Sequence, residues 1–254
     1  MIRVISWNVL HIVHEINYAF DNSIVLQKYP LEKDRLNKIF IKINSLLDDN
    51  SIICLQECPY DLLNLLNLLV SNNKHNIEYH KYRRMPFIKD NKPSPYIDCS
   101  EYLVTIYPKE YSIIKKMSFD IENQSKGALI LTFNNNLTIA NVHVPIIASA
   151  YSPNNYRKTL FKTLLENIKD LNYIIIGDFN TKNYQLKRDM FFEKNIVIPE
   201  IDGYTRKAMK NNKLEHTKLD HIILHNIQYD SAFVDSEDDD LSDHKYIGII
   251  MKNM

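Results

Sequence analysis

Short apolar runs that end in small polar clusters recur along the chain, and this pattern is the strongest constraint on its fold. Residues 2–7, 51–55 and 173–176 are such runs, and each is rich in β-branched side chains. Runs of this length and composition are typical of buried strands, because helices need longer periodic stretches. No Gly-, Ser- or Pro-rich linker interrupts the series. We therefore expect a single domain over residues 1–254, built around β-sheets.

The other predicted elements follow the same rules. Further strands are expected at residues 77–82, 102–107, 111–119, 128–134, 137–144, 219–224, 229–234 and 246–251. Apolar side chains recur at helical spacing in residues 31–48, 62–69, 154–170 and 184–194. The polar stretches 83–101 and 203–218 and the acidic run 235–243 are expected to be surface loops. Because hairpins dominate the order, we predict a largely antiparallel two-layer core with helices outside it.

Composition excludes several classes of protein. Lys plus Arg and Asp plus Glu each total 31, so the formal net charge is zero. A protein that grips long nucleic acid by bulk charge needs excess cations, so only a local basic groove stays possible. The cysteines Cys54, Cys58 and Cys99 lack zinc-site spacing and fit a reduced intracellular setting, the cytoplasm or nucleus. Without a signal peptide or an apolar run of about 18–20 residues, we expect no membrane anchor.

Six polar clusters that follow apolar runs carry acids, carboxamides and histidines. They are Trp7-Asn8, Gln56-Glu57, Asn141-Val142-His143, Gly177-Asp178-Phe179-Asn180, Leu219-Asp220-His221 and Ser242-Asp243-His244. Any one of them alone is more typical of a turn or a helix cap. Together, at strand ends, they offer oxygen ligands that suit Mg²⁺ or Mn²⁺ and imidazoles that neutralise a phosphate oxyanion. The set favours metal-assisted hydrolysis of a phosphoester.

The order and wording of these clusters resemble the endonuclease/exonuclease/phosphatase superfamily. This group includes apurinic endonucleases, pancreatic-type deoxyribonuclease, deadenylases, tyrosyl-DNA phosphodiesterases, neutral sphingomyelinases and inositol polyphosphate phosphatases. The matching segments are Ser6-Trp7-Asn8-Val9, Leu55-Gln56-Glu57, Asn141-Val142-His143-Val144-Pro145, Gly177-Asp178-Phe179-Asn180, Leu219-Asp220-His221-Ile222-Ile223 and Ser242-Asp243-His244. The resemblance implies a four-layer α/β sandwich, in which two mainly antiparallel mixed sheets pack face to face with helices outside.

The resemblance also implies a metal site and a set of catalytic residues. Glu57, with Asn8 beside it, would bind Mg²⁺, for which Mn²⁺ could substitute. Asp243 would bind the metal or support its loop. These three residues are therefore the candidate metal ligands.

The catalytic roles implied by the resemblance fall on five further residues. Asp178 would orient or deprotonate the attacking water, and Asn180 would hold the phosphate and that aspartate. His143 and His244 would contact the phosphate oxygens. Asp220 would pair with His244 and favour its cationic form.

Four residues are predicted to contact the substrate. Arg83 and Arg84 lie in a basic stretch with tyrosines, and Arg206 lies in a second basic stretch. Bases stack on aromatic rings while cations hold phosphates, although charge runs are often only solvated loops. His11 follows Asn8 in a segment that would line the cleft, and its surroundings do not form a His-Glu-x-x-His zinc motif.

Departures from the superfamily pattern bear on the substrate. Leu10 stands where apurinic endonucleases and tyrosyl-DNA phosphodiesterases carry Asp, and deadenylase-like members share this Asn-Val-Leu wording. His143 stands where apurinic endonucleases carry Tyr. We therefore expect a monomeric Mg²⁺-dependent phosphodiesterase of nucleic acid or a nucleotide-like end, with RNA or single-stranded ends favoured. A tyrosyl-DNA phosphodiesterase or DNA-repair endonuclease, a lipid or inositol phosphate hydrolase, and a catalytically silent scaffold stay open as alternatives.

Overall fold

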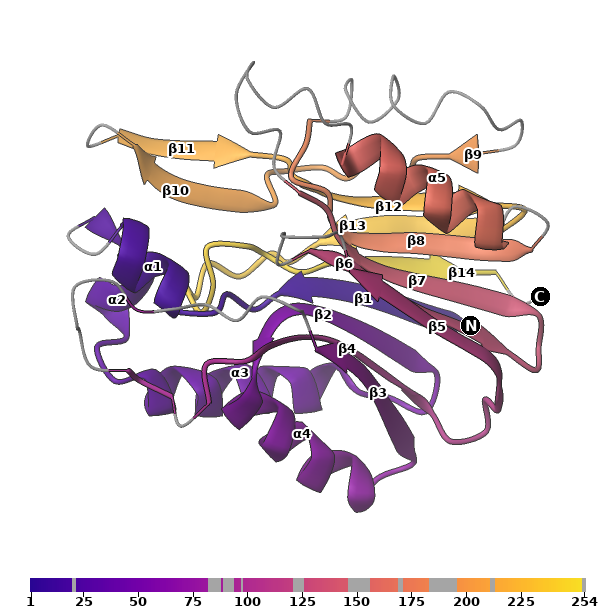
Figure 1. Ribbon diagram of the computed structural model, residues 1–254, viewed down its shortest axis with the longest axis horizontal. Coiled ribbons are helices and arrows are strands. Elements are labelled where there is room, and N and C mark those ends of the chain that lie inside the picture. Colours follow the sequence, from indigo (N-terminus) through magenta and orange to yellow (C-terminus); the bar gives the residue numbers. More distant parts are fainter. Residues whose placement is uncertain are drawn as a thin grey trace.

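Two six-stranded sheets form the centre of the protein (Figure 1). The computed structural model describes residues 1–19, 22–81, 88, 94–96, 98–120, 126–145, 156–168, 171–182, 196–210 and 213–252. In spatial order, the first sheet contains β13 (Tyr229–Val234), β14 (Ile247–Met251), β1 (Ile2–Asn8), β2 (Ser51–Pro59), β4 (Glu101–Pro108) and β3 (His75–Lys81). The second contains β5 (Ile113–Asp120), β6 (Gly127–Phe133), β7 (Leu137–His143), β8 (Asn172–Asp178), β12 (Asp220–His225) and β9 (Ile196–Val197). Two strand pairs, β1 with β2 and β7 with β8, are parallel.

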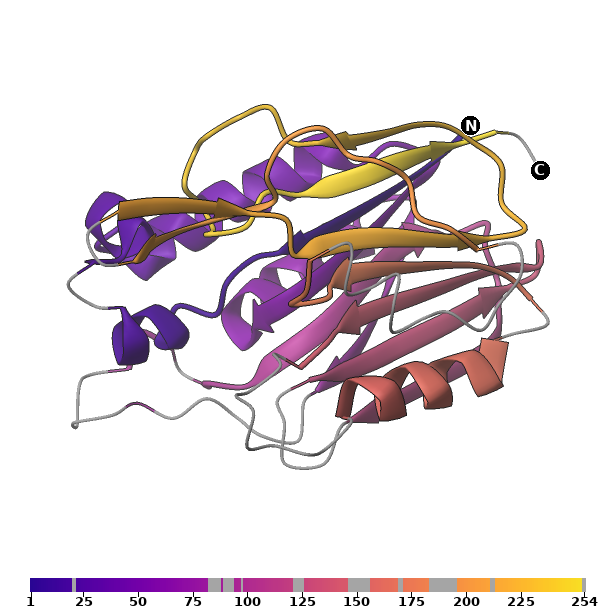
Figure 2. The same cartoon turned by 90° about the horizontal axis from the view of Figure 1, so that it is seen from above.

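Helices cover the outer faces of the two sheets. In Figure 2, α3 (Glu32–Leu46) and α4 (Tyr60–Ser71) lie on one side and α5 (Tyr156–Ile168) lies on the other. Neighbouring residues of β1 show the layering, because Ile5 packs in the core under α3 and α4 while Val4 packs in the core between the sheets. Strands buried on both faces read as continuous apolar runs, which is why these strands were visible in the sequence. The predicted four-layer α/β sandwich is confirmed.

The stretch 203–218 is not a loop throughout, and this prediction was wrong. It contains a hairpin of β10 (Arg206–Lys210) and β11 (Lys213–Thr217), which stands at the same end of the sandwich as α1 (Val13–Tyr18) (Figure 1). The hairpin was missed because its strands carry mostly charged and polar side chains, with little apolar face to signal burial. The short elements α1, α2 (Ile24–Lys28) and β9 were missed because they span too few residues to show periodicity.

The remaining expectations differ only at their edges or fall outside the described residues. The strand expected to end at Leu55 continues to Pro59, with an irregular register between Leu55 and Cys58. The acidic run 235–243 is a loop, and Lys42 anchors it by contacts of 2.6 Å to Asp235 and 3.1 Å to Glu237. The predicted helix 184–194 lies outside the described residues. Among the described helices, none is long and apolar enough to cross a membrane.

Candidate active site

Strand register brings the predicted site residues to one edge of the sandwich. In the second sheet Asp178 is the register partner of His143 on one side and of Asp220 on the other. In the first sheet Asn8 ends β1 beside Gln56 of β2. Asn8, His143 and Asp178 end their strands and Asp220 begins β12, so packing of the apolar strands places these polar groups at the rim.

Gly177 sets the spacing between Asp178 and its neighbouring strand. Its φ is +151°, and a Cβ built on it would lie 2.0 Å from the backbone oxygen of Val142. No other residue type could allow β7 and β8 to approach this closely. The glycine therefore lets His143 and Asp178 stand side by side.

Asp178 lies at the centre of the site. Its Oδ2 accepts hydrogen bonds from Nδ2 of Asn8 at 3.1 Å and Nδ2 of Asn180 at 3.2 Å, and its Oδ1 accepts from the Asn180 amide at 2.8 Å. Nε2 of His143 lies 3.3 Å and Nε2 of His244 lies 3.9 Å from Oδ2. Burial alone would raise the pKa of Asp178, but His244 and His143 outweigh it and hold the pKa below its ordinary value. The carboxylate is thus a buried anion that is held in one orientation.

Glu57 reaches the same place from a bulge in β2. Its φ is +54°, an uncommon value for a residue with a side chain and one that clusters at functional sites. Its Oε1 accepts a hydrogen bond from Nδ2 of Asn8 at 3.2 Å, and its Oε2 accepts from the His11 amide at 3.1 Å. One carboxamide, that of Asn8, therefore joins Glu57 to Asp178.

Basic side chains surround Glu57. Among the described residues, nitrogen atoms of His143, Lys126 and His14 lie 3.5, 3.7 and 3.8 Å from its carboxylate oxygens. Although burial opposes it, His14, Lys126 and His143 hold the pKa of Glu57 well below its ordinary value. Lys126 also contacts His143. Sequence reasoning missed Lys126, because one lysine before a strand is not distinguishable from a solvated residue.

His244 and Asp220 form the pair that the sequence predicted. Nδ1 of His244 lies 2.8 Å from Oδ2 of Asp220, and both side chains are buried. Burial alone would lower the pKa of His244, but Asp220, Asp243 and Asp178 raise it to about 10. The imidazole is therefore a cation at neutral pH, and its Nε2 faces Asp178.

Asp243 and Arg206 lie beside this pair. Nε of Arg206 donates to Oδ2 of Asp243 at 2.8 Å. Oδ1 of Asp243 is buried and has no hydrogen-bond partner among the described residues. This acceptor could take a cation or a substrate donor, so the metal role of Asp243 and the substrate role of Arg206 stay predictions.

Of the other predicted substrate contacts, the structure describes only His11. Arg83 and Arg84 lie outside the described residues. The ring of His11 is fully buried and packs 4.6 Å from that of Tyr96, between ring centroids. Its link to the site is the backbone amide that donates to Glu57, and a substrate contact by its ring stays a prediction.

The donor set fits a hard divalent cation. Ligand atoms of Glu57, His143 and Asp178 lie within 4.8 Å of one another, and the same holds for Asp178, Asp220 and His244. A third group, His14, Glu57 and Glu101, meets the same criterion. Carboxylate oxygens with the Asn8 carboxamide nearby are the ligands that Mg²⁺ and Mn²⁺ take. Glu57, which shares the Asn8 carboxamide with Asp178, is the residue that would hold such an ion.

No family model and no curated relative matches the chain. Solved structures do resemble it over nearly its whole length. A D. rerio TDP2 complexed with single strand DNA product has a TM-score of 0.68 at 16% identity, and covers 99% of each chain. An endonuclease/exonuclease/phosphatase family protein from Leptotrichia buccalis has a TM-score of 0.66 at 12% identity, with 100% of each chain covered. The Bacteroides vulgatus endonuclease/exonuclease/phosphatase has a TM-score of 0.66 at 15% identity, with 99% of this chain and 98% of that chain covered.

These likenesses establish the fold. The chain has the fold of endonuclease/exonuclease/phosphatase proteins, as its polar clusters predicted. At these identities the likeness does not establish an activity. The case for a function therefore rests on the geometry of the site itself.

Proposed function

We propose that this chain, which has the endonuclease/exonuclease/phosphatase fold, is a metal-dependent phosphodiesterase that acts on nucleic acid. The observation that supports this most directly is the environment of Asp178. A buried carboxylate is fixed by two carboxamides and faces two histidines, one of which is held cationic by Asp220. A carboxylate fixed in this way beside two imidazoles is placed to align a water molecule against a phosphoryl group.

Each residue then has a role in hydrolysis. Asp178 accepts a proton from the attacking water or orients it, because Asn8 and Asn180 fix its oxygens. His244 presents a cation, and His143 a second imidazole, toward the phosphoryl oxygens, where negative charge grows in the transition state. Mg²⁺ or Mn²⁺ held through Glu57 would add a Lewis acid for the same charge. Asp220 keeps the His244 ring in place.

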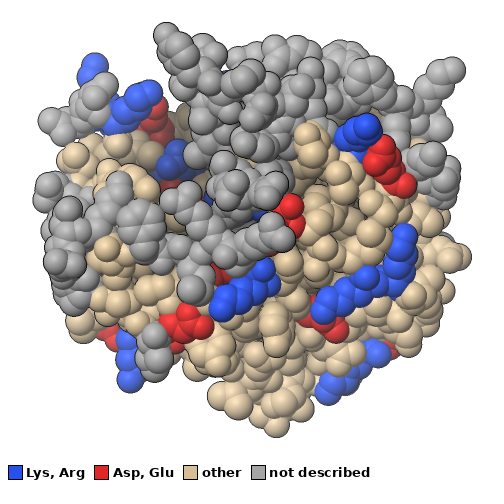
Figure 3. Space-filling model, viewed as in Figure 1, with Lys and Arg blue, Asp and Glu red and all other residues tan. Residues whose placement is uncertain are grey.

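Nucleic acid is the substrate class that the surroundings favour. Arg206 lies beside the site, and one protein of similar structure is a D. rerio TDP2 complexed with single strand DNA product. Within the described part of the face in Figure 3, basic and acidic side chains alternate without forming one large basic field. Binding would then depend on local contacts, as at a single-stranded end, more than on bulk charge.

A second candidate is a phosphodiesterase that acts on single-stranded DNA in particular, which the single strand DNA product in that TDP2 structure favours. An assay panel separates the candidates: single-stranded RNA, poly(A), duplex DNA, abasic DNA, 5′-tyrosyl DNA and a lipid head-group ester. Each is incubated with Mg²⁺ or Mn²⁺ and again with a chelator. Turnover of the lipid ester above every nucleic acid would overturn the proposed substrate class.

Asp178→Asn tests the proposed chemistry. The amide cannot accept the proton of water, so we expect kcat to fall by about 10²–10⁴-fold. Asp230→Asn, an exposed carboxylate on β13, is the matched control and should keep wild-type activity. Equal turnover by both variants would remove Asp178 from the mechanism.

A further inference from the structure

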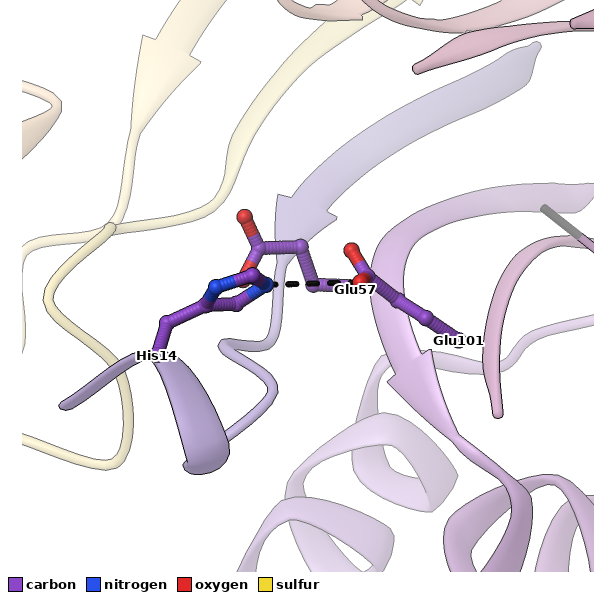
Figure 4. A group of neighbouring side chains, drawn as sticks. All are labelled: His14, Glu57 and Glu101. Atoms are coloured by element: carbon purple, nitrogen blue, oxygen red, sulfur yellow. Dashed lines mark hydrogen bonds and ion pairs between the residues drawn. The ribbon is translucent and has the colours of Figure 1, made fainter. Parts of the chain in front are cut away.

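A second cluster of cation ligands adjoins the site, and it joins Glu57 to two residues that the proposed mechanism does not use. It contains His14 of α1, Glu57 of β2 and Glu101 of β4 (Figure 4). In Figure 4 the His14 ring points toward the two carboxylates. Nε2 of His14 lies 3.3 Å from Oε2 of Glu101 and 3.8 Å from Oε2 of Glu57.

The spacing of these atoms suits a single metal ion. Atoms that bind one ion at about 2.1 Å lie about 3 to 4.2 Å from each other, depending on the coordination angle. Both measured distances from His14 fall within that range. All three ligand atoms lie within 4.8 Å of one another, so small rotations of the carboxylates would bring them around one ion.

Glu101 supplies an independent reason to look for a ligand here. Its side chain is fully buried, and its Oε1 has no hydrogen-bond partner among the described residues. A carboxyl oxygen without a partner is costly to bury, so such an atom needs a cation or a hydrogen-bond donor. His14 contacts Oε2, which leaves Oε1 as an open ligand at the cluster.

The segment that follows Asn8 offers no ligand at the second residue along. Two residues after Asn8 stands Leu10, which is buried in the apolar core beneath α3 and α4. It cannot ligate an ion. Glu101, at the start of β4, is instead placed to provide a carboxylate in addition to that of Glu57.

We propose that His14, Glu57 and Glu101 bind one divalent cation, and that the imidazole makes this site prefer first-row transition-metal ions over Mg²⁺. Imidazole is a ligand for transition metals, whereas Mg²⁺ takes oxygen ligands and keeps much of its water. This deepens the proposed function by naming the residues and the class of ion. It concerns binding, so it can be tested whether or not a substrate is found.

Mn²⁺ is the probe, because its paramagnetism reports both binding and its ligands. Binding to the metal-free protein is measured by the loss of the free Mn²⁺ signal, and Mg²⁺ affinity by competition. We expect wild type to bind Mn²⁺ about tenfold or more tightly than Mg²⁺, and Glu101→Gln to weaken Mn²⁺ binding about tenfold or more. Glu78→Gln, on the neighbouring β3, is the matched control and should change neither affinity.

His14→Gln separates a ligand from an ion-pair partner. The amide oxygen can still bind Mg²⁺, so the ratio of Mn²⁺ to Mg²⁺ affinity should fall while Mg²⁺ binding changes little. His216→Gln, an exposed residue of β11, is the control. Unchanged affinities in both His14→Gln and Glu101→Gln would overturn the proposal, because His14 would then be an ion-pair partner only.

A spectroscopic measurement on the wild-type chain guards against variants that fold poorly. Bound Mn²⁺ should show nitrogen coupling from an imidazole, lost in His14→Gln and retained in His143→Gln. Absence of that coupling in wild type, or its loss in His143→Gln alone, would overturn the proposal. Mn²⁺ bound through His14 in a chain that hydrolyses no phosphodiester would leave this inference standing and reject the proposed function. Hydrolysis of a phosphodiester by a chain whose bound Mn²⁺ shows no coupling to His14 would support the proposed function and reject this inference.

Discussion

At the scale of single residues, the site consists of buried charges that are held by opposite charges. Asp178 and Glu57 are buried anions, and His244 is a buried cation. Burying any one of them alone would cost several kcal/mol, so each requires its partners. Substitutions at these positions therefore act through the groups left behind as well as through the group removed.

Asp220 and His244 should behave as one unit in catalysis. Asp220 contacts His244 and has no direct place at the reacting phosphate in the proposed mechanism. Asp220→Asn and His244→Asn should each lower kcat by about 10²–10⁴-fold, and the double variant should lose little more than His244→Asn alone. Steady-state kinetics of wild type and the three variants form a double-mutant cycle. Fully additive losses would show that Asp220 acts independently of His244.

At the scale of elements, two features hold the site edge together. One is the close approach of β7 and β8 at Gly177. The other is Arg35 of α3, whose guanidinium donates to the backbone oxygens of Val9 and Leu10 at 2.8 Å and of Leu241 at 2.6 Å. These segments flank Asn8 and Asp243, so a helix on the outer layer orders loops of the site.

Gly177→Ala should destabilise the protein strongly. Its Cβ would overlap the oxygen of Val142 in a conformation that L-residues rarely adopt, and we expect a loss of about 2–4 kcal/mol in the free energy of unfolding. Gly203→Ala is the comparison. The φ of Gly203 is also positive, at +106°, but the described atom nearest to its added Cβ is a side-chain atom of Val234 at 3.2 Å. Urea unfolding measures both. A loss at position 177 no larger than that at 203 would contradict the argument from strand approach.

Arg35→Met should cost about 3–5 kcal/mol. It removes a buried ion pair with Glu32, whose oxygens lie 2.6 Å from the guanidinium, and leaves three buried carbonyls without their donor. Lys33→Met, exposed on the same helix, should stay within about 0.5 kcal/mol of wild type. The two variants are compared by urea unfolding. Similar midpoints would show that the Arg35 contacts contribute little to stability.

At the scale of the whole molecule, the apolar layers bury two thiols whose ionisation the fold suppresses. Cys54 packs between the sheets, where burial raises its pKa from 9.0 to about 12. Cys58 packs under α3 and α4, where burial also raises its pKa. Since the thiolate is the reactive form, both thiols should react with a disulfide reagent only on global unfolding, and the half-buried Cys99 sooner.

The same burial predicts a pH dependence of stability. Above pH 9 the unfolded chain loses the Cys54 proton while the folded chain retains it, so stability falls as pH rises toward 12, by at most about 1.4 kcal/mol per pH unit. Below pH 9 this residue contributes no slope. Cys54→Ala should flatten the stability profile between pH 9 and 11, and Cys99→Ala should not. Parallel urea profiles for wild type and Cys54→Ala would contradict the assigned burial.

The sequence alone determined the strands of the core, since apolar β-branched runs buried on both faces leave a continuous local signal. It also determined which polar side chains lie next to those apolar runs, so Asn8, Glu57, Asp178 and His244 could be predicted to converge. Lys126, His14 and Glu101 could not be predicted in the same way. Their proximity to Glu57 depends on the register of β2 with β4, the bulge at Glu57 and the docking of α1, and these are set by packing between segments far apart in the chain.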